Sequence, residues 1–348
     1  MFDISKVDKN FKINSRIEKT DIKFYNVDET PFKIYGIFKE NGKYRRLPES
    51  VAKKVSSGVH VLHTHTTGGR VKFVTDSPYI AIYTKMGALG KMPHFALTGS
   101  IGFDMYEGDH FVNTFVPPFD ITDGYESLFE FEDKKEREIT INFPLYSEVL
   151  DLYIGLQENS VLKEAKPYKN DKPIVFYGSS ITHGGCASRP GMSYQAILSR
   201  MFEYDYINLG FSGSALAEDE IADYIKNLDM SIFVYDYDWN APTVEHLEQT
   251  HEKMFKKIRE KHPHLPVIMM SRPKHFLTRE EEIRRSIVEK TYLDAVSSGD
   301  KNVYFVDGKA LTKLCGDSGT VDYAHPTDFG FYSMAKAVAE VITIINSK

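Results

Sequence analysis

The stretch KPIVFYGSSITHGG (172–185) begins as an apolar run and then breaks into glycine and small hydroxyl residues. A short apolar run that ends at glycine is typical of a buried strand followed by a turn. Gly178, Ser179 and Ser180 therefore stand just past the end of a predicted strand. Two interpretations are open at this point: a plain turn, or a turn whose serine attacks a substrate.

Strand-like runs and amphipathic helical stretches alternate from residue 173 to the C-terminus. The strand-like runs are PIVFYG (173–178), YINLG (206–210), SIFVYDY (231–237), PVIMMS (266–271) and VYFVDG (303–308), and the helical stretches cover 193–202, 218–228, 244–261, 279–298 and 329–346. Fully apolar strands that alternate with helices predict an α/β fold, in which a parallel sheet carries helices on both faces. Such folds bind their ligands at the carboxyl ends of the strands.

The N-terminal half follows a different pattern. From about residue 20 to residue 155, apolar and polar residues alternate in stretches such as 32–47, 59–86 and 139–156, which NG, GG and DSP turns interrupt. Period-two patterning of this kind predicts antiparallel strands in an all-β sandwich. The polar, lysine-rich segment 157–173 indicates a linker. We therefore predict a β-sandwich domain in residues 1–165, with a linker at about 157–172, and an α/β domain in residues 173–348.

Composition narrows the class of protein. The chain has 348 residues, 42% of them hydrophobic, which is enough for two domains with packed cores. The net charge of -6 gives no electrostatic footprint for nucleic acid or an anionic membrane, so we expect a small-molecule partner, and a homo-oligomer is left open. No segment approaches the roughly 18 apolar residues of a membrane span, and residues 1–21 lack the apolar core of a secretory signal. A cytoplasmic location is therefore expected.

A serine becomes a nucleophile only when a histidine takes its proton and an acid orients that histidine. The segment VDYAHPTDFG (321–330), just before the last predicted helix, holds Asp322 and His325 three residues apart. By itself this pair is equally consistent with a helix-capping aspartate and a surface histidine.

The reaction also needs donors for the oxyanion that forms when serine attacks a carbonyl. NLGFSGSA (208–215) follows the second predicted strand and YDYDWNAP (235–242) follows the third, which puts Gly213 and Asn240 at strand ends. Each is ordinary turn chemistry when taken separately. Together, four loops at one edge of the sheet each offer a residue that ester hydrolysis needs.

These four blocks, GSSIT, GFSG, YDYDWNAP and DYAHP, occur in the order and spacing of the blocks that define the SGNH hydrolases, or GDSL lipases and acylhydrolases. The sequence from about residue 172 to the C-terminus resembles that family. The resemblance implies a three-layer, flavodoxin-like hydrolase domain in which Ser180 is the nucleophile, His325 the general base and Asp322 its orienting partner. It also implies an oxyanion hole made by the backbone N–H groups of Ser180 and Gly213 and the side-chain amide of Asn240.

Two details refine the resemblance. The family's usual Gly-Asp-Ser is here Gly-Ser-Ser, with Ser179 in the place of an aspartate that is not part of the triad. The segment Gly102-Phe103-Asp104-Met105-Tyr106 is similar to the Gly-x-Asp-Leu-Tyr signature of a subgroup whose hydrolase domain follows a β-domain. This match extends the resemblance over nearly the whole chain and implies a jelly-roll-like sandwich in the N-terminal half.

Several residues compete for functional roles. Ser179 is the rival nucleophile, and Cys186 is a second one, although nothing nearby in the sequence would lower the pKa of its thiol. His63 and His65 would share a face of a strand and could bind a metal or line the pocket, but no third ligand stands at matching spacing. We therefore expect no metal and no cofactor.

Trp239 and Arg189 are the candidate substrate contacts. Trp239 precedes Asn240 and would suit stacking on a sugar ring, or it fills the core. Arg189 either contacts a polar substrate or braces the nucleophile loop. The sequence thus predicts a serine esterase that hydrolyses small acyl esters, acetyl for choice, on a carbohydrate or oligosaccharide. The alternatives are an acyltransferase with the same triad, a lipase- or thioesterase-type acylhydrolase, and an inert carbohydrate-binding protein.

Overall fold

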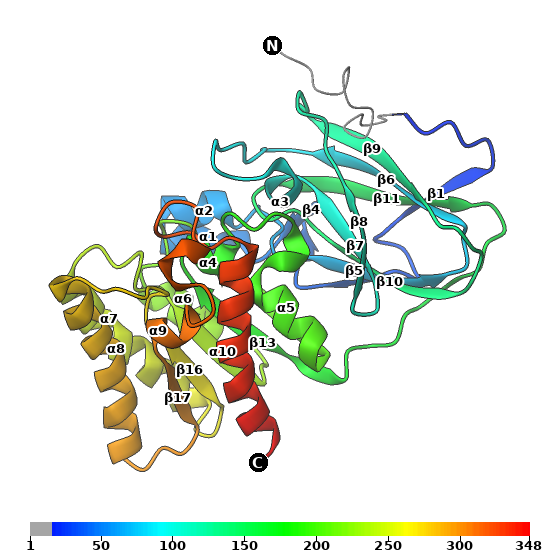
Figure 1. Ribbon diagram of the computed structural model, residues 1–348. Helices are drawn as coiled ribbons and strands as arrows, with labels where there is room; N and C mark the ends of the chain where they lie inside the picture. Colours follow the sequence, from blue (N-terminus) through cyan, green and yellow to red (C-terminus); the bar gives the residue numbers. More distant parts are fainter. Residues whose placement is uncertain (1–15) are drawn as a thin grey trace.

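Two antiparallel sheets face each other in the N-terminal half (Figure 1). The computed structural model describes residues 16–348. One sheet has the order β1 (Ile22–Asn26), β11 (Val149–Gln157), β6 (Tyr79–Met86) and β9 (Gly124–Glu130). The other has the order β12 (Leu162–Lys163), β5 (Arg70–Thr75), β10 (Arg137–Asn142), β7 (Phe103–Glu107) and β8 (His110–Phe115), with β2 (Lys33–Tyr35) on β5. Alternate side chains of both sheets form one apolar core, so the predicted sandwich is confirmed.

The N-terminal half also contains helices that the sequence pattern did not predict. After the hairpin of β3 (Phe38–Glu40) and β4 (Lys43–Arg45), the chain forms α1 (Glu49–Val55) and α2 (Ser57–Leu62), and a short α3 (Leu97–Ser100) follows later. Ser56 caps α2 by accepting a hydrogen bond from the Val59 N–H, which favours a helix over the expected strand. Both α1 and α2 pack into the apolar core of the C-terminal half, where α1 contacts α6 (Asp219–Ile225).

A five-stranded parallel sheet forms the centre of the C-terminal half. Its order is β14 (Tyr204–Gly210), β13 (Asn170–Gly178), β15 (Ile232–Asp236), β16 (Val267–Met270) and β17 (Val303–Val306). In this register Gly178 lies between Gly210 and Asp236. The loops that follow these three strands therefore leave the sheet side by side.

Helices cover both faces of this sheet, as the alternating pattern predicts. On one face α6, α7 (Val244–Lys261) and α8 (Arg279–Ser297) pack against β13, β15 and β16. On the other face α5 (Tyr194–Phe202) and α10 (Asp328–Asn346) pack against the same strands. The short helices α4 (Ser180–His183) and α9 (Gly308–Leu311) follow β13 and β17 directly. Among the helices within residues 16–348, none is long and apolar enough to span a bilayer.

Candidate active site

Two adjacent serines lie between the end of β13 and the start of α4. Ser179 is buried, whereas the Ser180 hydroxyl faces His325. A side chain at Gly178 would collide with the Asp236 carboxylate, so the strand end requires glycine. Ser179 is fully buried, and its hydroxyl caps α4 by accepting a hydrogen bond from the Ile181 N–H. Ser180, one residue later, has its Oγ 2.8 Å from Nε2 of His325. The geometry therefore favours Ser180 over its neighbour as the nucleophile.

His325 lies between Ser180 and Asp322. Its Nδ1 is 2.7 Å from Oδ2 of Asp322, and its backbone N–H donates to Oδ1 of the same carboxylate at 2.8 Å. Partial burial acts to raise the pKa of Asp322, but the two hydrogen bonds from His325 outweigh it and lower the pKa to about 2. The carboxylate is thus ionised at neutral pH and holds the proton of His325 on Nδ1, which leaves the Nε2 lone pair for the serine.

The candidate oxyanion donors converge on the same place. A pocket of about 300 Å³ beside Ser180 and His325 is lined also by Ile181, Ser212, Gly213, Trp239, Asn240 and Ala324. Gly213 adopts the left-handed region at φ +68°, and its N–H has no acceptor among the residues that the structure describes. The Ala215 N–H donates to Oδ1 of Asn240 at 3.2 Å, which leaves the amide N–H groups of Asn240 free to donate.

Replacing Asn240 with alanine is expected to lower kcat by about 10²–10³-fold and to change KM little, because a candidate oxyanion donor at this position would meet negative charge that develops only in the transition state. Steady-state kinetics on p-nitrophenyl acetate measure the effect. Asn240→Asp is the matched control, since it keeps the acceptor for Ala215 but removes the donor, and it should lose at least as much activity. A decrease of less than threefold in both variants would contradict the role.

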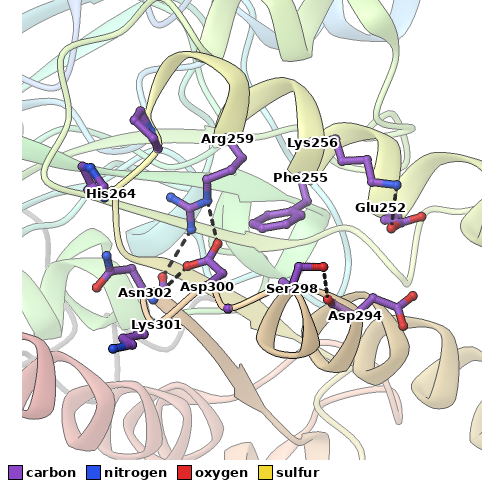
Figure 2. A pocket seen from close by; sticks show the side chains of 13 residues that line it. Glu252, Phe255, Lys256, Arg259, His264, Asp294, Ser298, Asp300, Lys301 and Asn302 are labelled. Carbon is purple, nitrogen blue, oxygen red and sulfur yellow. Dashed lines mark hydrogen bonds and ion pairs between the residues drawn. The ribbon is translucent and has the colours of Figure 1, made fainter.

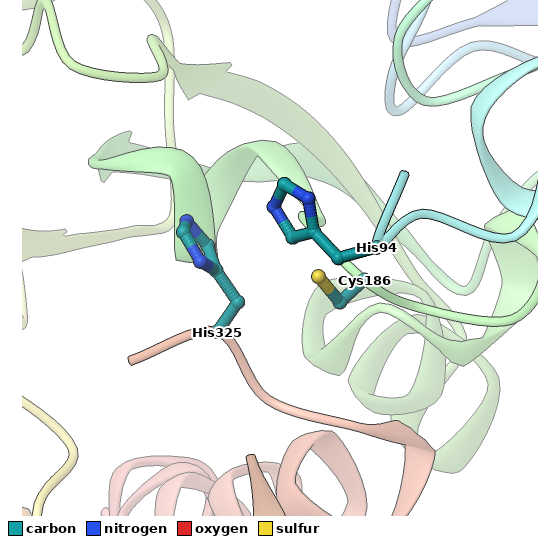
Figure 3. Close-up of side chains that lie close together, drawn as sticks. All are labelled: His94, Cys186 and His325. Carbon is teal, nitrogen blue, oxygen red and sulfur yellow. The ribbon is translucent and has the colours of Figure 1, made fainter. Parts of the chain in front are cut away.

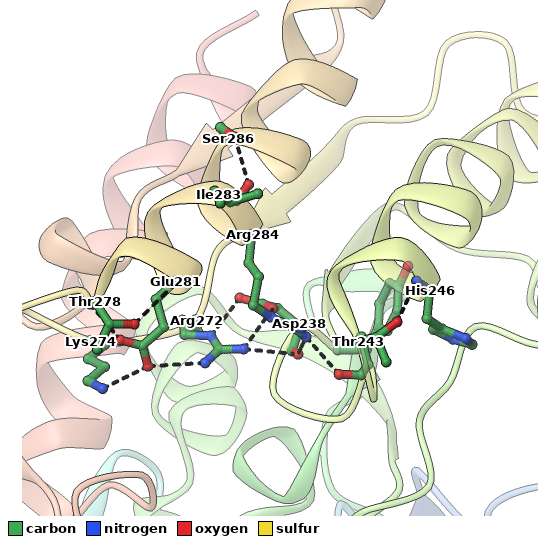
Figure 4. Close-up of polar contacts among 12 residues, drawn as sticks. Asp238, Thr243, His246, Arg272, Lys274, Thr278, Glu281, Ile283, Arg284 and Ser286 are labelled. Carbon is green, nitrogen blue, oxygen red and sulfur yellow. Dashed lines mark hydrogen bonds and ion pairs between the residues drawn. The ribbon is translucent and has the colours of Figure 1, made fainter.

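Two buried arginines hold the loop that carries Trp239 and Asn240 (Figure 4). Arg272 binds the Asp238 carboxylate through two hydrogen bonds of 2.9 and 3.0 Å. Arg284 donates to Oδ1 of Asp238 at 2.7 Å and to the carbonyls of Asp238 and Ala241 at 2.6 and 2.7 Å. Burial acts to raise the pKa of Asp238, but these cationic partners outweigh it and lower the pKa. Charge-assisted hydrogen bonds to Asp238 therefore hold this loop in place.

Arg284→Ala is expected to reduce the free energy of unfolding by about 1.5–3 kcal/mol, because it removes one of the two arginines that bind the buried Asp238 and leaves the Ala241 carbonyl without this donor, while Arg272 still pairs with Asp238. Urea unfolding of the purified variant measures the change. Arg285→Ala, which removes the neighbouring and more exposed arginine, is the matched control and should cost about 0–1 kcal/mol. Equal stability of the two variants would contradict the structural role of Arg284.

Residues of the N-terminal half contact the segment that carries Ser180. Tyr146 stacks on His183 of α4, with ring centroids 4.0 Å apart, and its hydroxyl donates to the Ser180 carbonyl at 3.2 Å. His65 also contacts His183, with Nδ1 3.3 Å from Nε2. Burial lowers the pKa of His183 and lowers that of His65 to about 3, so both rings are neutral at neutral pH. Sequence reasoning missed Tyr146 and His183, because no motif signals contacts between distant segments.

The remaining candidates lie as follows. His63 and His65 are not on a strand: His63 follows α2 and stacks on His60, so the geometry assumed for a metal pair is wrong. Burial raises the pKa of Cys186 to about 12, so its thiol stays protonated and is a poor nucleophile. Trp239 lines the pocket, with the Arg272 guanidinium 4.4 Å above its ring.

Arg189 lies outside the pocket and contacts the N-terminal half. Its guanidinium is 3.5 Å from the buried carboxylate of Asp104 and 4.0 Å from the ring centre of Phe111. The same carboxylate accepts hydrogen bonds from the Gly191 N–H and the Asn142 amide, both at 2.8 Å. The aspartate of the Gly-x-Asp-Met-Tyr segment thus fastens the loop after α4 to the sandwich.

A larger pocket of about 660 Å³ lies elsewhere in the molecule (Figure 2). It is formed by the end of α7, the end of α8 and the segment before β17, and Arg259 and Asp300 form an ion pair within it. These segments meet at the amino ends of β16 and β17, opposite the edge that carries Ser180. Because ligands of such sheets bind at the carboxyl ends, the smaller pocket is the candidate active site.

A serine at the end of a parallel strand, with a histidine, a carboxylate and convergent N–H donors around it, defines a serine hydrolase. The sequence model of the GDSL-like lipase/acylhydrolase family matches residues 171–343, and that of the GxDLY domain, the N-terminus of SGNH-type esterases, matches residues 22–162. The chain belongs to this family of SGNH-type esterases and is a carboxylic ester hydrolase.

Solved structures with the same fold cover nearly the whole chain. A GDSL-like lipase from Bacteroides ovatus is 27% identical, with a TM-score of 0.83 over 94% of this chain and 98% of that one. The salicylyl-acyltransferase SsfX3 of a tetracycline biosynthetic pathway is 18% identical, with a TM-score of 0.76 over 94% and 99%. An acetyl xylan esterase from Butyrivibrio proteoclasticus is 11% identical, with a TM-score of 0.59 over 94% and 99%. No curated protein sequence matches the chain.

Proposed function

We propose that this esterase removes small acyl groups, acetyl for choice, from a carbohydrate. The observation that carries the proposal is the pocket at Ser180, which at about 300 Å³ is at the lower end of the range for small-molecule sites. Ile181 and Trp239 line it beside the nucleophile, and an indole is the kind of surface on which sugar rings stack. The acetyl xylan esterase that shares the fold is a carbohydrate-acting relative consistent with this choice.

In the proposed reaction, Oγ of Ser180 attacks the ester carbonyl while Nε2 of His325 takes its proton. The N–H groups of Ser180 and Gly213 and the Asn240 amide stabilise the oxyanion. His325 then protonates the leaving alcohol, and an acyl group remains on Ser180. Water attacks this acyl-enzyme with His325 again as base, and the Asp322 carboxylate stabilises the imidazolium in both steps.

The test compares p-nitrophenyl esters of increasing acyl length with acetylated xylo- and cello-oligosaccharides. We expect kcat/KM to fall as the acyl chain lengthens and acetate to be released from the oligosaccharides. Trp239→Ala should impair the oligosaccharides more than p-nitrophenyl acetate, whereas Trp239→Phe, which keeps an aromatic face, should restore part of the loss. A preference for long acyl chains, or equal effects of Trp239→Ala on both substrate classes, would overturn the proposal.

Acyl transfer is the second candidate, because an acyltransferase also shares the fold and the same residues would form its acyl-enzyme. Adding an acceptor sugar separates the two. A hydrolase releases free acetate at an unchanged rate, whereas a transferase forms the acylated acceptor at the expense of acetate.

A further inference from the structure

Three side chains from separate segments meet beside the active site (Figure 3). They are His94, from the loop between β6 and α3, Cys186, which follows α4, and His325, which precedes α10. One ligand atom of each residue lies within 4.8 Å of the others. Imidazole nitrogen and cysteine sulfur are the donors that Zn²⁺ and similar borderline-soft cations prefer. We propose that His94, Cys186 and His325 bind such a cation and that its binding switches the esterase off.

The distances require a small adjustment. With Zn–N bonds of about 2.0–2.1 Å and a Zn–S bond of about 2.3 Å, tetrahedral ligand atoms lie roughly 3.3–3.6 Å apart. Because the three atoms lie within 4.8 Å of one another, each pair must close by at most about 1.2–1.5 Å, which a rotation of an exposed side chain can supply. The His94 side chain is 38% exposed. The fourth position is left to water.

Two of the ligands are not held by hydrogen bonds. Neither the His94 ring nor the Cys186 thiol makes a hydrogen bond within residues 16–348, and Cys186 is not in a disulfide. Cys186 stands at φ +70°, in the left-handed region that favours glycine. A cysteine at this position is therefore under local backbone strain, which is typical of functional sites. The Asp322 carboxylate, 3.9 Å from Nε2 of His94, adds negative charge that favours a cation.

The third ligand, His325, is the general base of the proposed reaction. The inhibitory effect of the cation therefore rests on the proposed function. Nδ1 of His325 carries the proton shared with Asp322, so the lone pair available to a metal is on Nε2. That nitrogen lies 2.8 Å from Ser180 Oγ, from which it takes the proton during catalysis. A cation bound to Nε2 occupies this lone pair, while the Cys186 thiol releases its proton to solvent. Binding of the cation and activation of the serine therefore exclude each other.

Metal binding is tested directly with Co²⁺ and Cd²⁺, whose thiolate complexes absorb in the ultraviolet, independently of any activity. Ser180→Ala protein should bind one equivalent and develop the thiolate-to-metal absorption band, and Cys315→Ser, which removes the other cysteine, should retain it. Cys186→Ser should lose the band, and His94→Ala should weaken binding at least tenfold. Absence of the band from the wild type, or its persistence in Cys186→Ser, would overturn the site even if the esterase assignment stands.

Inhibition is tested by Zn²⁺ titration of p-nitrophenyl acetate hydrolysis in a buffer that does not chelate metals. Cys186→Ser and His94→Ala should keep substantial activity without Zn²⁺ and should need at least tenfold more of it for half-inhibition than the wild type. A chelator should restore wild-type activity. Equal sensitivity of the wild type and both variants would overturn the switch. If the wild type lacks esterase activity altogether, the proposed function fails, and the absorption titration still decides the metal site.

Discussion

Ser180→Ala is expected to lower kcat by on the order of 10⁶-fold, the scale on which removal of a triad nucleophile acts. The Ser180 hydroxyl lies 2.8 Å from His325 Nε2, in the lining of the pocket that also contains the candidate oxyanion donors. Alanine removes the attacking atom and leaves the turn unchanged, because Ser179 rather than Ser180 caps α4. Steady-state kinetics on p-nitrophenyl acetate measure the loss.

Ser179→Ala is the matched control for this prediction. It removes an N-cap hydroxyl that is fully buried, so it should cost about 1 kcal/mol of stability and change kcat by less than tenfold. A serine-directed fluorophosphonate should label the peptide that contains both serines in Ser179→Ala and fail to label it in Ser180→Ala. Retained activity in Ser180→Ala together with loss in Ser179→Ala would reverse the assignment.

The α/β half was predictable from sequence because its strands are buried on both faces. Such strands, PIVFYG and SIFVYDY among them, read as continuous apolar runs, and the helices between them have a clear period. The edge of the sheet where the site lies then follows from strand direction alone. The register that sets Gly178 between Gly210 and Asp236 explains why four motifs far apart in the sequence meet there.

The N-terminal half was less predictable, for two physical reasons. The sequence VHVLH (59–63) alternates like a strand, but Ser56 caps it as a helix, and Val59 and Leu62 pack into the core of the other half. Tertiary burial overrides the local pattern there. Tyr146 and His94 reach the active site only because the two halves pack together, and nothing local in the sequence records that contact.

Buried polar residues were missed for a similar reason. Arg46 is 1% exposed and donates to the carbonyls of Asn208 and Gly210 at 2.8 and 2.9 Å, which joins the N-terminal half to the end of β14. In the sequence Arg46 belongs to KYRR (43–46), a short basic run whose pattern predicts side chains exposed to solvent. A guanidinium can be buried where several carbonyls accept its hydrogen bonds, and these acceptors become visible only in the folded chain.

Asp322→Asn is expected to lower kcat by on the order of 10⁴-fold with little change in KM, because it reverses the hydrogen bond that sets the His325 tautomer. Oδ1 of Asp322 accepts from the N–H groups of Ala324 and His325 at 3.2 and 2.8 Å, so an asparagine oxygen is expected to keep that position. Its amide group then faces Nδ1 of His325 and donates to it. The ring must carry its proton on Nε2, where it cannot accept the proton of Ser180.

Asp317→Asn is the matched control for this substitution. Asp317 also accepts two backbone N–H groups, those of His275 and Phe276 at 2.7 and 3.2 Å, but it contacts no imidazole of the triad. Asp322→Asn should keep a melting temperature close to that of the wild type, Asp317→Asn should lower it slightly because the exposed 3.2 Å bond from the Phe276 N–H loses its acceptor, and only Asp322→Asn should lose activity. The substitution is expected to leave the structure of the loop unchanged and to alter only the tautomer of His325. A loss of less than tenfold in Asp322→Asn would therefore mean that a group other than this carboxylate orients His325.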